Sequence, residues 1–181
     1  MADVDETETR SMLHPAPFVS EAALRSGGVE TRYHRAGRGR TVLLLAEGSF
    51  PSAPADRLFE GLSRSFRVIR PGMQSGRRTT PGVPADPTPT TTWIREIIDG
   101  LGLGRCALVA EGTPSLSAAW LAFTDPARVS HLVLCVPEPP DPPPSVGSIS
   151  DLLTGSGRPV MLTRSDPELK QIVEFLLRAP T

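Results

Sequence analysis

The sequence predicts an α/β protein in which helices cover both faces of one doubly wound, mostly parallel β-sheet. Three observations predict this class. Short apolar runs alternate with amphipathic helical segments along the chain. Most of these runs are continuous, without the polar residue at every second position that a half-exposed strand would show, so they indicate strands buried on both faces. The chain has 181 residues, of which 39% are hydrophobic, enough for one domain with its own core.

Six segments are typical of strands. Residues 28–37 alternate weakly between polar and apolar positions, which indicates an edge strand. Residues 41–47, "TVLLLAE", are apolar almost throughout and end before Gly48, as in a strand buried within a parallel sheet. The other predicted strands are 66–72, 105–112, 130–137 and 158–166. Helical segments lie between most of these strands, and this alternation predicts βαβ units.

Helical periodicity occupies the intervals between the strands. Residues 54–65 carry three apolar residues on one helical face, and proline stands in their first turn. Residues 90–103 carry five, after threonines that suit a helix start and before Gly102, which ends the helix. The apolar faces are Leu58, Phe59 and Leu62 in the first helix and Trp93, Ile94, Ile97, Ile98 and Leu101 in the second. Further helices are predicted at 115–123, 148–157 and 167–180.

The remaining segments have compositions unsuited to a packed core. Residues 1–17 mix acidic residues, threonine and proline without periodicity, which predicts a disordered N-terminal arm before a single domain at 18–181. Two proline-rich stretches, 81–89 and 137–144, are predicted to be surface loops because proline lacks the N–H that a helix or a central strand requires.

Charge and cysteine content exclude several classes of function. The 19 basic and 20 acidic residues leave a net charge of −1, and the arginines are scattered, so we expect no nucleic-acid partner. No apolar run approaches the roughly 20 residues that span a bilayer, and the first ten residues are acidic, so we expect a cytoplasmic protein without membrane contact. Cys106 and Cys135 lie in separate apolar runs, which predicts two buried thiols, no metal site and no cofactor.

Three stretches resemble the α/β-hydrolase fold family. "TVLLLAEG" is similar to the family's strand that ends in a His-Gly pair at the oxyanion hole, and "FRVIRPGMQSG" is similar to its next strand and turn. "LGLGRCALVAEG", with "DPARVSHLVL" after a small-residue helix, is similar to the nucleophile strand, the elbow helix and the strand that follows. The resemblance covers about 29–178 and implies an α/β-hydrolase-like fold with a reduced cap and a truncated C-terminal end.

The resemblance places a glycine where the family has its nucleophile. The family's G-x-S-x-G turn falls on residues 110–114, and Gly112 takes the serine position. Because the elbow residue holds a positive φ, which strains any residue with a Cβ, glycine keeps the turn at little cost. Thr113 is suited to cap the following helix and Pro114 to begin it. The elbow is therefore predicted to be degenerate, kept in shape without its hydroxyl.

The family's catalytic histidine has no counterpart in this sequence, and its acid has one candidate. His14, His34 and His131 are the chain's only histidines, and none lies beyond Ser145, where the family places its catalytic base. Asp166 matches the family's acid after the penultimate strand, although a simpler interpretation is that it caps the final helix. The segment for the family's last strand and histidine loop is predicted to be absent. Ordinary serine hydrolysis is therefore not expected.

Two substitutes for the triad remain open. Ser115 and Ser117 are candidate displaced nucleophiles, but a hydroxyl in the first turns of a helix tends to bond a backbone carbonyl. Glu47 and Glu111 follow or end adjacent predicted strands, where their charges oppose oxyanion chemistry. They would serve as an acid/base pair if burial raised one of their pKa values, and as solvated rim residues otherwise.

Two function classes follow. The first is a pseudoenzyme that binds a small ligand or a protein partner, in which Gly48, Ser49, Gly112 and Thr113 form the ligand site. The second is an enzyme with non-hydrolytic or displaced-nucleophile chemistry on a small carbonyl or ester compound, for example in natural-product metabolism. Its candidate catalytic residues are Glu111, Glu47, Asp166 and Ser115. A missing final strand would leave an open sheet edge, which also favours an oligomer.

Overall fold

The computed structural model describes residues 19–26, 29–47, 53–73, 88–136, 157–164 and 168–178. The predicted N-terminal arm, the proline-rich loop at 137–144 and nearly all of the loop at 81–89 lie outside these ranges. The predicted helix at 148–157 also lies outside them, except for its last residue.

Seven strands form one sheet in the described part of the chain, in the order β1-β2-β4-β3-β5-β6-β7. The strands are β1 Ser20–Ser26, β2 Val29–Ala36, β3 Thr41–Ala46, β4 Arg67–Pro71, β5 Cys106–Glu111, β6 Val129–Val136 and β7 Val160–Arg164. The two pairings of β2, with β1 and with β4, are antiparallel, and the other four pairings are parallel. The prediction of a mostly parallel sheet is confirmed.

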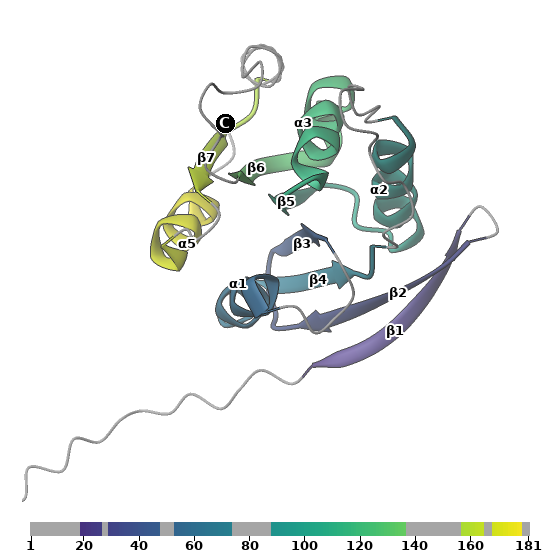
Figure 1. Ribbon diagram of the computed structural model, residues 1–181, viewed down its shortest axis with the longest axis horizontal. Helices are drawn as coiled ribbons and strands as arrows, with labels where there is room; N and C mark the ends of the chain where they lie inside the picture. Colours follow the sequence, from purple (N-terminus) through teal and green to yellow (C-terminus); the bar gives the residue numbers. More distant parts are fainter. Residues whose placement is uncertain are drawn as a thin grey trace, which may run out of the picture.

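Helices cover both faces of this sheet. They are α1 Ala53–Ser63, α2 Thr88–Gly100, α3 Pro114–Thr124 and α5 Leu169–Leu177, and a short 3₁₀ turn, η1, spans Pro126–Arg128. Figure 1 shows α2 and α3 together on one side of the sheet and α1 and α5 on the other. The doubly wound arrangement predicted from the alternation of strands and helices is therefore confirmed. No helix of the described part is long and apolar enough to cross a membrane.

The continuous apolar sequence of β3 is explained by its two buried faces. Its five residues after Thr41 are all buried. Leu43 and Leu45 pack with the helices α2 and α3, whereas Val42 and Leu44 pack with α1 and α5. Burial of one such side chain contributes roughly 1.5–3 kcal/mol, so this central strand anchors both halves of the core.

The N-terminal hairpin differs from the prediction. The strand expected at the edge, β2, lies between β1 and β4, and the edge strand is β1, which the sequence pattern did not indicate. The sequence of β1, "SEAALRS", holds one large apolar residue and no β-branched one, so it lacks the composition of a strand. Leu24 of β1 packs against α2, where a Cβ on Gly100 would meet its Cδ atoms at 2.9 Å. Tertiary packing thus holds this strand.

An ion pair between α1 and β4 was also not predicted. The guanidinium of Arg70 is only 2% exposed, and its Nη1 donates a hydrogen bond to the carboxylate of Asp56 in the first turn of α1. Burial of a charge without a partner would be costly, so this pair fixes the start of α1 against β4.

Candidate functional site

The turn between β5 and α3 has the geometry predicted for the elbow. It consists of Gly112 and Thr113, and Gly112 has a φ of +74°. Its N–H donates to the carbonyl of Cys135 in β6 at 3.1 Å, and its carbonyl accepts from the N–H of Ser115 at 3.1 Å. A glycine holds this left-handed conformation without the strain that a serine would experience. The backbone of the elbow is therefore present, whereas the position that projects above the sheet carries no side chain.

Glu47 lies directly beside this position. A Cβ built on Gly112 would lie 3.7 Å from Cδ of Glu47, an ordinary van der Waals distance. The N–H of Thr113 donates to Oε1 of Glu47 at 3.2 Å. The 66 residues that separate the two in sequence explain why no local pattern indicated this contact.

The carboxylate of Glu47 takes the capping role that was predicted for Thr113. Thr113 stands at the N-cap of α3 as expected, and Pro114 follows in the first turn, but the side chain of Thr113 makes no capping hydrogen bond. A negative charge at a helix N-terminus is favourable because the unpaired N–H groups there carry partial positive charge. Glu47 supplies that charge from the end of β3.

The two serines of α3 lie in the protein interior. Ser115 is 3% exposed and Ser117 is 5% exposed. The hydroxyl of Ser115 donates to the carbonyl of Ala110 at 3.3 Å, which is the backbone bond expected for a hydroxyl in the first turn of a helix. The backbone carbonyl of Ser117 accepts from the hydroxyl of Thr91 of α2 at 3.2 Å. Both serines thus lie within the contact between α3 and its neighbours.

Glu111 ends β5 and is half-buried. Its register partners are Ala46 of β3 and Cys135 of β6. Burial, and secondarily the negative charge of Glu111, raise the pKa of the Cys135 thiol to about 12, so this thiol stays protonated at neutral pH. The structure therefore brings Glu47, Glu111, Gly112 and Thr113 together at the carboxyl ends of β3 and β5. The candidates Gly48, Ser49 and Asp166 lie outside the described residues; the N-cap position of α5 falls on Glu168.

The described histidines lie far from the elbow. His34 is in β2, which β4 and β3 separate from β5. Three strand spacings amount to about 14 Å, well beyond hydrogen-bond range of Ser115. His131 lies near the amino end of β6, whereas the elbow follows the carboxyl end of β5. His14 lies outside the described residues.

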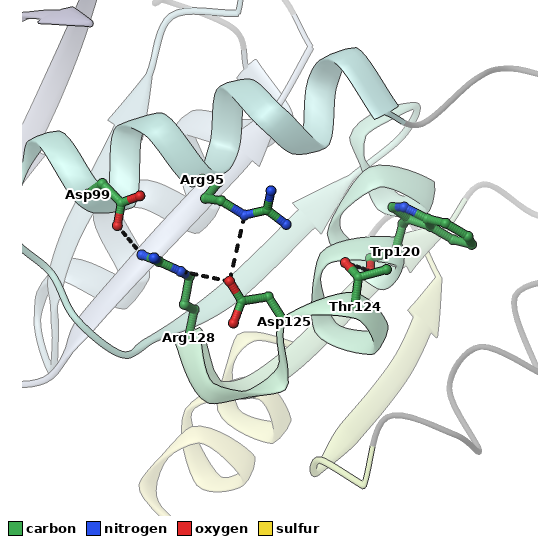
Figure 2. Close-up of polar contacts among 6 residues, drawn as sticks. All are labelled: Arg95, Asp99, Trp120, Thr124, Asp125 and Arg128. Carbon is green, nitrogen blue, oxygen red and sulfur yellow. Dashed lines mark hydrogen bonds and ion pairs between the residues drawn. The ribbon is translucent and has the colours of Figure 1, made fainter.

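An ion-pair cluster fixes the other end of the elbow helix (Figure 2). Arg128 of η1 donates to Asp99 of α2 and to Asp125, the latter at 2.7 Å, and Arg95 of α2 lies 3.6 Å from Asp125. The hydroxyl of Thr124 donates to the carbonyl of Trp120 at 2.8 Å. The bonds to Asp99 first and Asp125 second raise the pKa of Arg128, so its charge is permanent. The "DPAR" phrase of the sequence thus joins α3 to α2.

No metal site is formed by the described residues. Within them, no group of three or more histidine, cysteine, aspartate or glutamate side chains is placed to hold an ion. Cys106 and Cys135 are both buried free thiols, as predicted. Burial raises the pKa of Cys106 to about 12 as well.

Solved structures similar to this chain are α/β-hydrolase fold enzymes. Cfl2 from Burkholderia cenocepacia has 23% sequence identity and a TM-score of 0.55, with 71% of this chain and 45% of that chain covered. A hydrolase from Pseudomonas aeruginosa PA01 has 22% identity and a TM-score of 0.54, with 67% and 48% covered. The meta-cleavage product hydrolase CumD from Pseudomonas fluorescens IP01 has 27% identity and a TM-score of 0.53, with 65% and 46% covered.

These likenesses concern the fold. The chain spans less than half the length of each of the three neighbours. No protein-family model matches it. No curated protein sequence matches it. The mostly parallel sheet and these structural similarities show that the chain has an α/β-hydrolase-like fold.

Proposed function

We propose that this protein is a non-hydrolytic α/β-hydrolase-fold protein that acts by binding a small ligand or a protein partner at the carboxyl ends of β3 and β5. The observation that carries the proposal is the hydrogen bond from the N–H of Thr113 to the carboxylate of Glu47. In hydrolases of this fold, the N–H of the residue after the nucleophile is one donor of the oxyanion hole. In this chain that donor is already bound to an anion.

The bound carboxylate opposes hydrolysis in two ways. It occupies a donor whose loss lowers kcat by about 10²–10³ in a serine hydrolase. It also places a negative charge where a tetrahedral intermediate would develop its own. A carboxylate at this position therefore removes the electrostatic stabilisation that the elbow would otherwise provide.

The reacting groups support the same conclusion. Gly112 has no hydroxyl, and the hydroxyl of Ser115 is buried against the carbonyl of Ala110. Neither of the two histidines in the described ranges lies beside the elbow. Members of a triad act as a unit, so one restored member would recover little of the rate.

The acid/base alternative gains no support from the geometry. A pair of carboxylates works as acid and base when burial holds one of them protonated near neutral pH. Glu47 is exposed, and its carboxylate already accepts a hydrogen bond from Thr113. Binding without chemistry is therefore the function that the elbow supports best.

Labelling with a fluorophosphonate probe, followed by intact-mass measurement, tests the loss of hydrolytic chemistry. The wild type, Gly112→Ser and the double variant Gly112→Ser/Glu47→Gln are compared with a known serine hydrolase. We expect no adduct on any of the three forms, because a hydroxyl at position 112 would still have no base. A stoichiometric adduct on the wild type would overturn the proposal.

Binding itself is tested by thermal shift against a panel of small amides and amines, whose donors suit the acidic strand ends. A ligand at 100 times its Kd adds about 2.7 kcal/mol to stability, which is readily measured. A compound that raises the melting temperature must also shift the amide resonances of Gly112 and Thr113, and Gly112→Val must abolish the effect. Hits that leave these two resonances unmoved would place binding elsewhere and contradict the assigned site.

A further inference from the structure

A cavity lies at the opposite end of the sheet from the elbow. It has a volume of about 190 Å³ and is formed where β3, β5 and β6 begin, on the face covered by α1 and α5. Its apolar wall includes Val42, Phe66, Ala107 and Leu176. The elbow follows the carboxyl end of β5, so the cavity and the site proposed above are separated by the length of the strands.

A buried histidine lines this cavity. His131 is 2% exposed, and its Nε2 is buried with no hydrogen-bond partner in the part of the chain that the structure describes. Its ring packs edge-on against Phe175 of α5, with centroids 5.4 Å apart, so its orientation is fixed. Buried polar atoms are nearly always hydrogen-bonded, and an unpaired nitrogen beside a hollow is therefore a feature that a ligand would complete.

The cavity also has positive charge on one side. Arg40 lines it, and Nη1 of Arg40 is held by carbonyls at the end of α5, including that of Arg178 at 3.3 Å. Burial first, then the positive charge of Arg40, lower the pKa of His131, and Arg105 adds to this effect, whereas the carbonyl of Arg178 opposes it. The two side-chain charges that act on the imidazole are thus both positive, which favours an anion.

We propose that this cavity binds a small aromatic monocarboxylate, whose carboxylate lies beside Arg40 and the imidazole of His131 and whose ring packs on the apolar wall. The size agrees, because an apolar cavity of about 150 Å³ takes up benzene. About 190 Å³ therefore accommodates a ring with one carboxylate attached. This site is independent of the site at the elbow, and either can fail without the other.

Histidine-selective NMR of the full chain, titrated with sodium benzoate at pH 7, tests this site directly. The chain has three histidines, so its spectrum holds three imidazole Hε1 resonances. We expect one of them to shift saturably, and it should be the one that disappears in His131→Gln. Benzamide, which is similar in shape but uncharged, should bind about tenfold more weakly, since hydrogen bonds to charged groups are the stronger ones. No saturable shift up to the solubility limit of benzoate would overturn the proposal, as would equal affinity for benzamide.

Variants separate the cavity from the elbow. Ala107→Leu fills the hollow and should abolish benzoate binding, and Arg40→Gln should weaken it about fivefold or more. Glu60→Gln, on the exposed side of α1, is the control and should bind benzoate as the wild type does. Binding by Ala107→Leu at wild-type affinity, or loss of binding in Glu60→Gln, would contradict the assignment. The wild-type titration distinguishes binding from its absence even if a variant does not fold. The result of the fluorophosphonate labelling does not depend on benzoate binding, so the proposed function and this cavity site are tested separately.

Discussion

The two ends of the β-sheet differ in how their buried or functional polar groups are paired. Where the strands end, Glu47 is bonded to the N–H of Thr113, and Arg70 is bonded to Asp56. Where the strands begin, Nε2 of His131 has no partner among the described residues, and the residue lines a cavity. Among the described residues, the polar groups named at the end that carries the active site in hydrolases of this fold are thus paired within the chain. At the other end, a buried nitrogen without a described partner lies in a residue that lines a cavity.

This difference supports the proposal that the chain keeps the fold without the hydrolytic site. Function is set by particular side chains on a fold, and the strand-turn-helix frame persists here with an internal anion at its donor. The buried nitrogen that lacks a partner among the described residues, Nε2 of His131, lies instead at the amino ends of the strands. The resemblance to the family did not predict a site at that end. The following substitutions test this contrast, from the largest expected effect to the smallest.

Asp56→Ala should destabilise the protein most. It leaves the buried guanidinium of Arg70 without its ionic partner on α1. Loss of one member of a buried ion pair costs about 3–5 kcal/mol. Urea unfolding followed by circular dichroism measures the change. Arg67→Gln, which removes an exposed hydrogen bond to Thr41, is the control and should change stability by less than about 0.5 kcal/mol. Equal changes in the free energy of unfolding of the two variants would show that the buried ion pair contributes no more to stability than the exposed hydrogen bonding of Arg67.

His131→Leu should stabilise the protein by about 1 kcal/mol at pH 7. It removes a buried nitrogen that lacks a partner in the described structure, at the cost of the edge-on contact with Phe175 and of the contact between the imidazole and the carbonyl of Arg178. Such a gain is typical of positions kept for function rather than for stability. Chemical unfolding measures it, and a loss of stability would indicate that Nε2 is satisfied within the folded chain.

The pH dependence of stability should report the same histidine. Its pKa is lowered from the ordinary value of 6.5 in the folded protein, so the unfolded chain takes up the proton first as the pH falls. Stability should therefore be full above about pH 7 and decrease as the pH falls below the ordinary value of 6.5. Unfolding midpoints across this range measure the slope. His131→Leu should flatten it, and a slope that persists in His131→Leu would contradict this assignment.

Glu47→Gln should have the smallest effect, a loss of about 0.3–1 kcal/mol. It removes the negative charge from the N-terminus of α3 but keeps an oxygen that accepts from Thr113. The loss should shrink in high salt because the interaction is exposed. Glu60→Gln, on the exposed side of α1, is the matched control. A salt-independent loss would indicate packing rather than charge.

Most of the fold could be predicted from local patterns. The apolar runs of β3, β5 and β6 and the periodicity of α2 each contain their own signal, and the elbow glycine predicted its positive φ. The edge strand β1 could not be predicted, because its sequence has little strand propensity and Leu24 is held by a helix about 70 residues away.

Individual residues of the candidate site could be predicted from the sequence, but the contacts between them could not. The sequence indicated Gly112 and drew attention to Glu47, but the bond between Glu47 and Thr113 depends on the register of β3 with β5. His131 gave no signal at all, since its surroundings come from one helix, three strands and two turns that lie far apart in the chain. Groups defined by such long-range packing leave no trace in a local pattern.

The central place of β3 has a consequence for how the chain folds during synthesis. Its neighbour β5 follows 65 residues later, with Ala46 paired to Glu111. At the usual pace of translation this is a delay of roughly 3 to 13 s. During that interval one edge of "TVLLLA", an uncharged and mostly apolar run, remains unpaired, and unpaired apolar strands readily associate with one another. The strand that anchors the finished core is therefore open to association with other chains while the rest of its sheet is being synthesised.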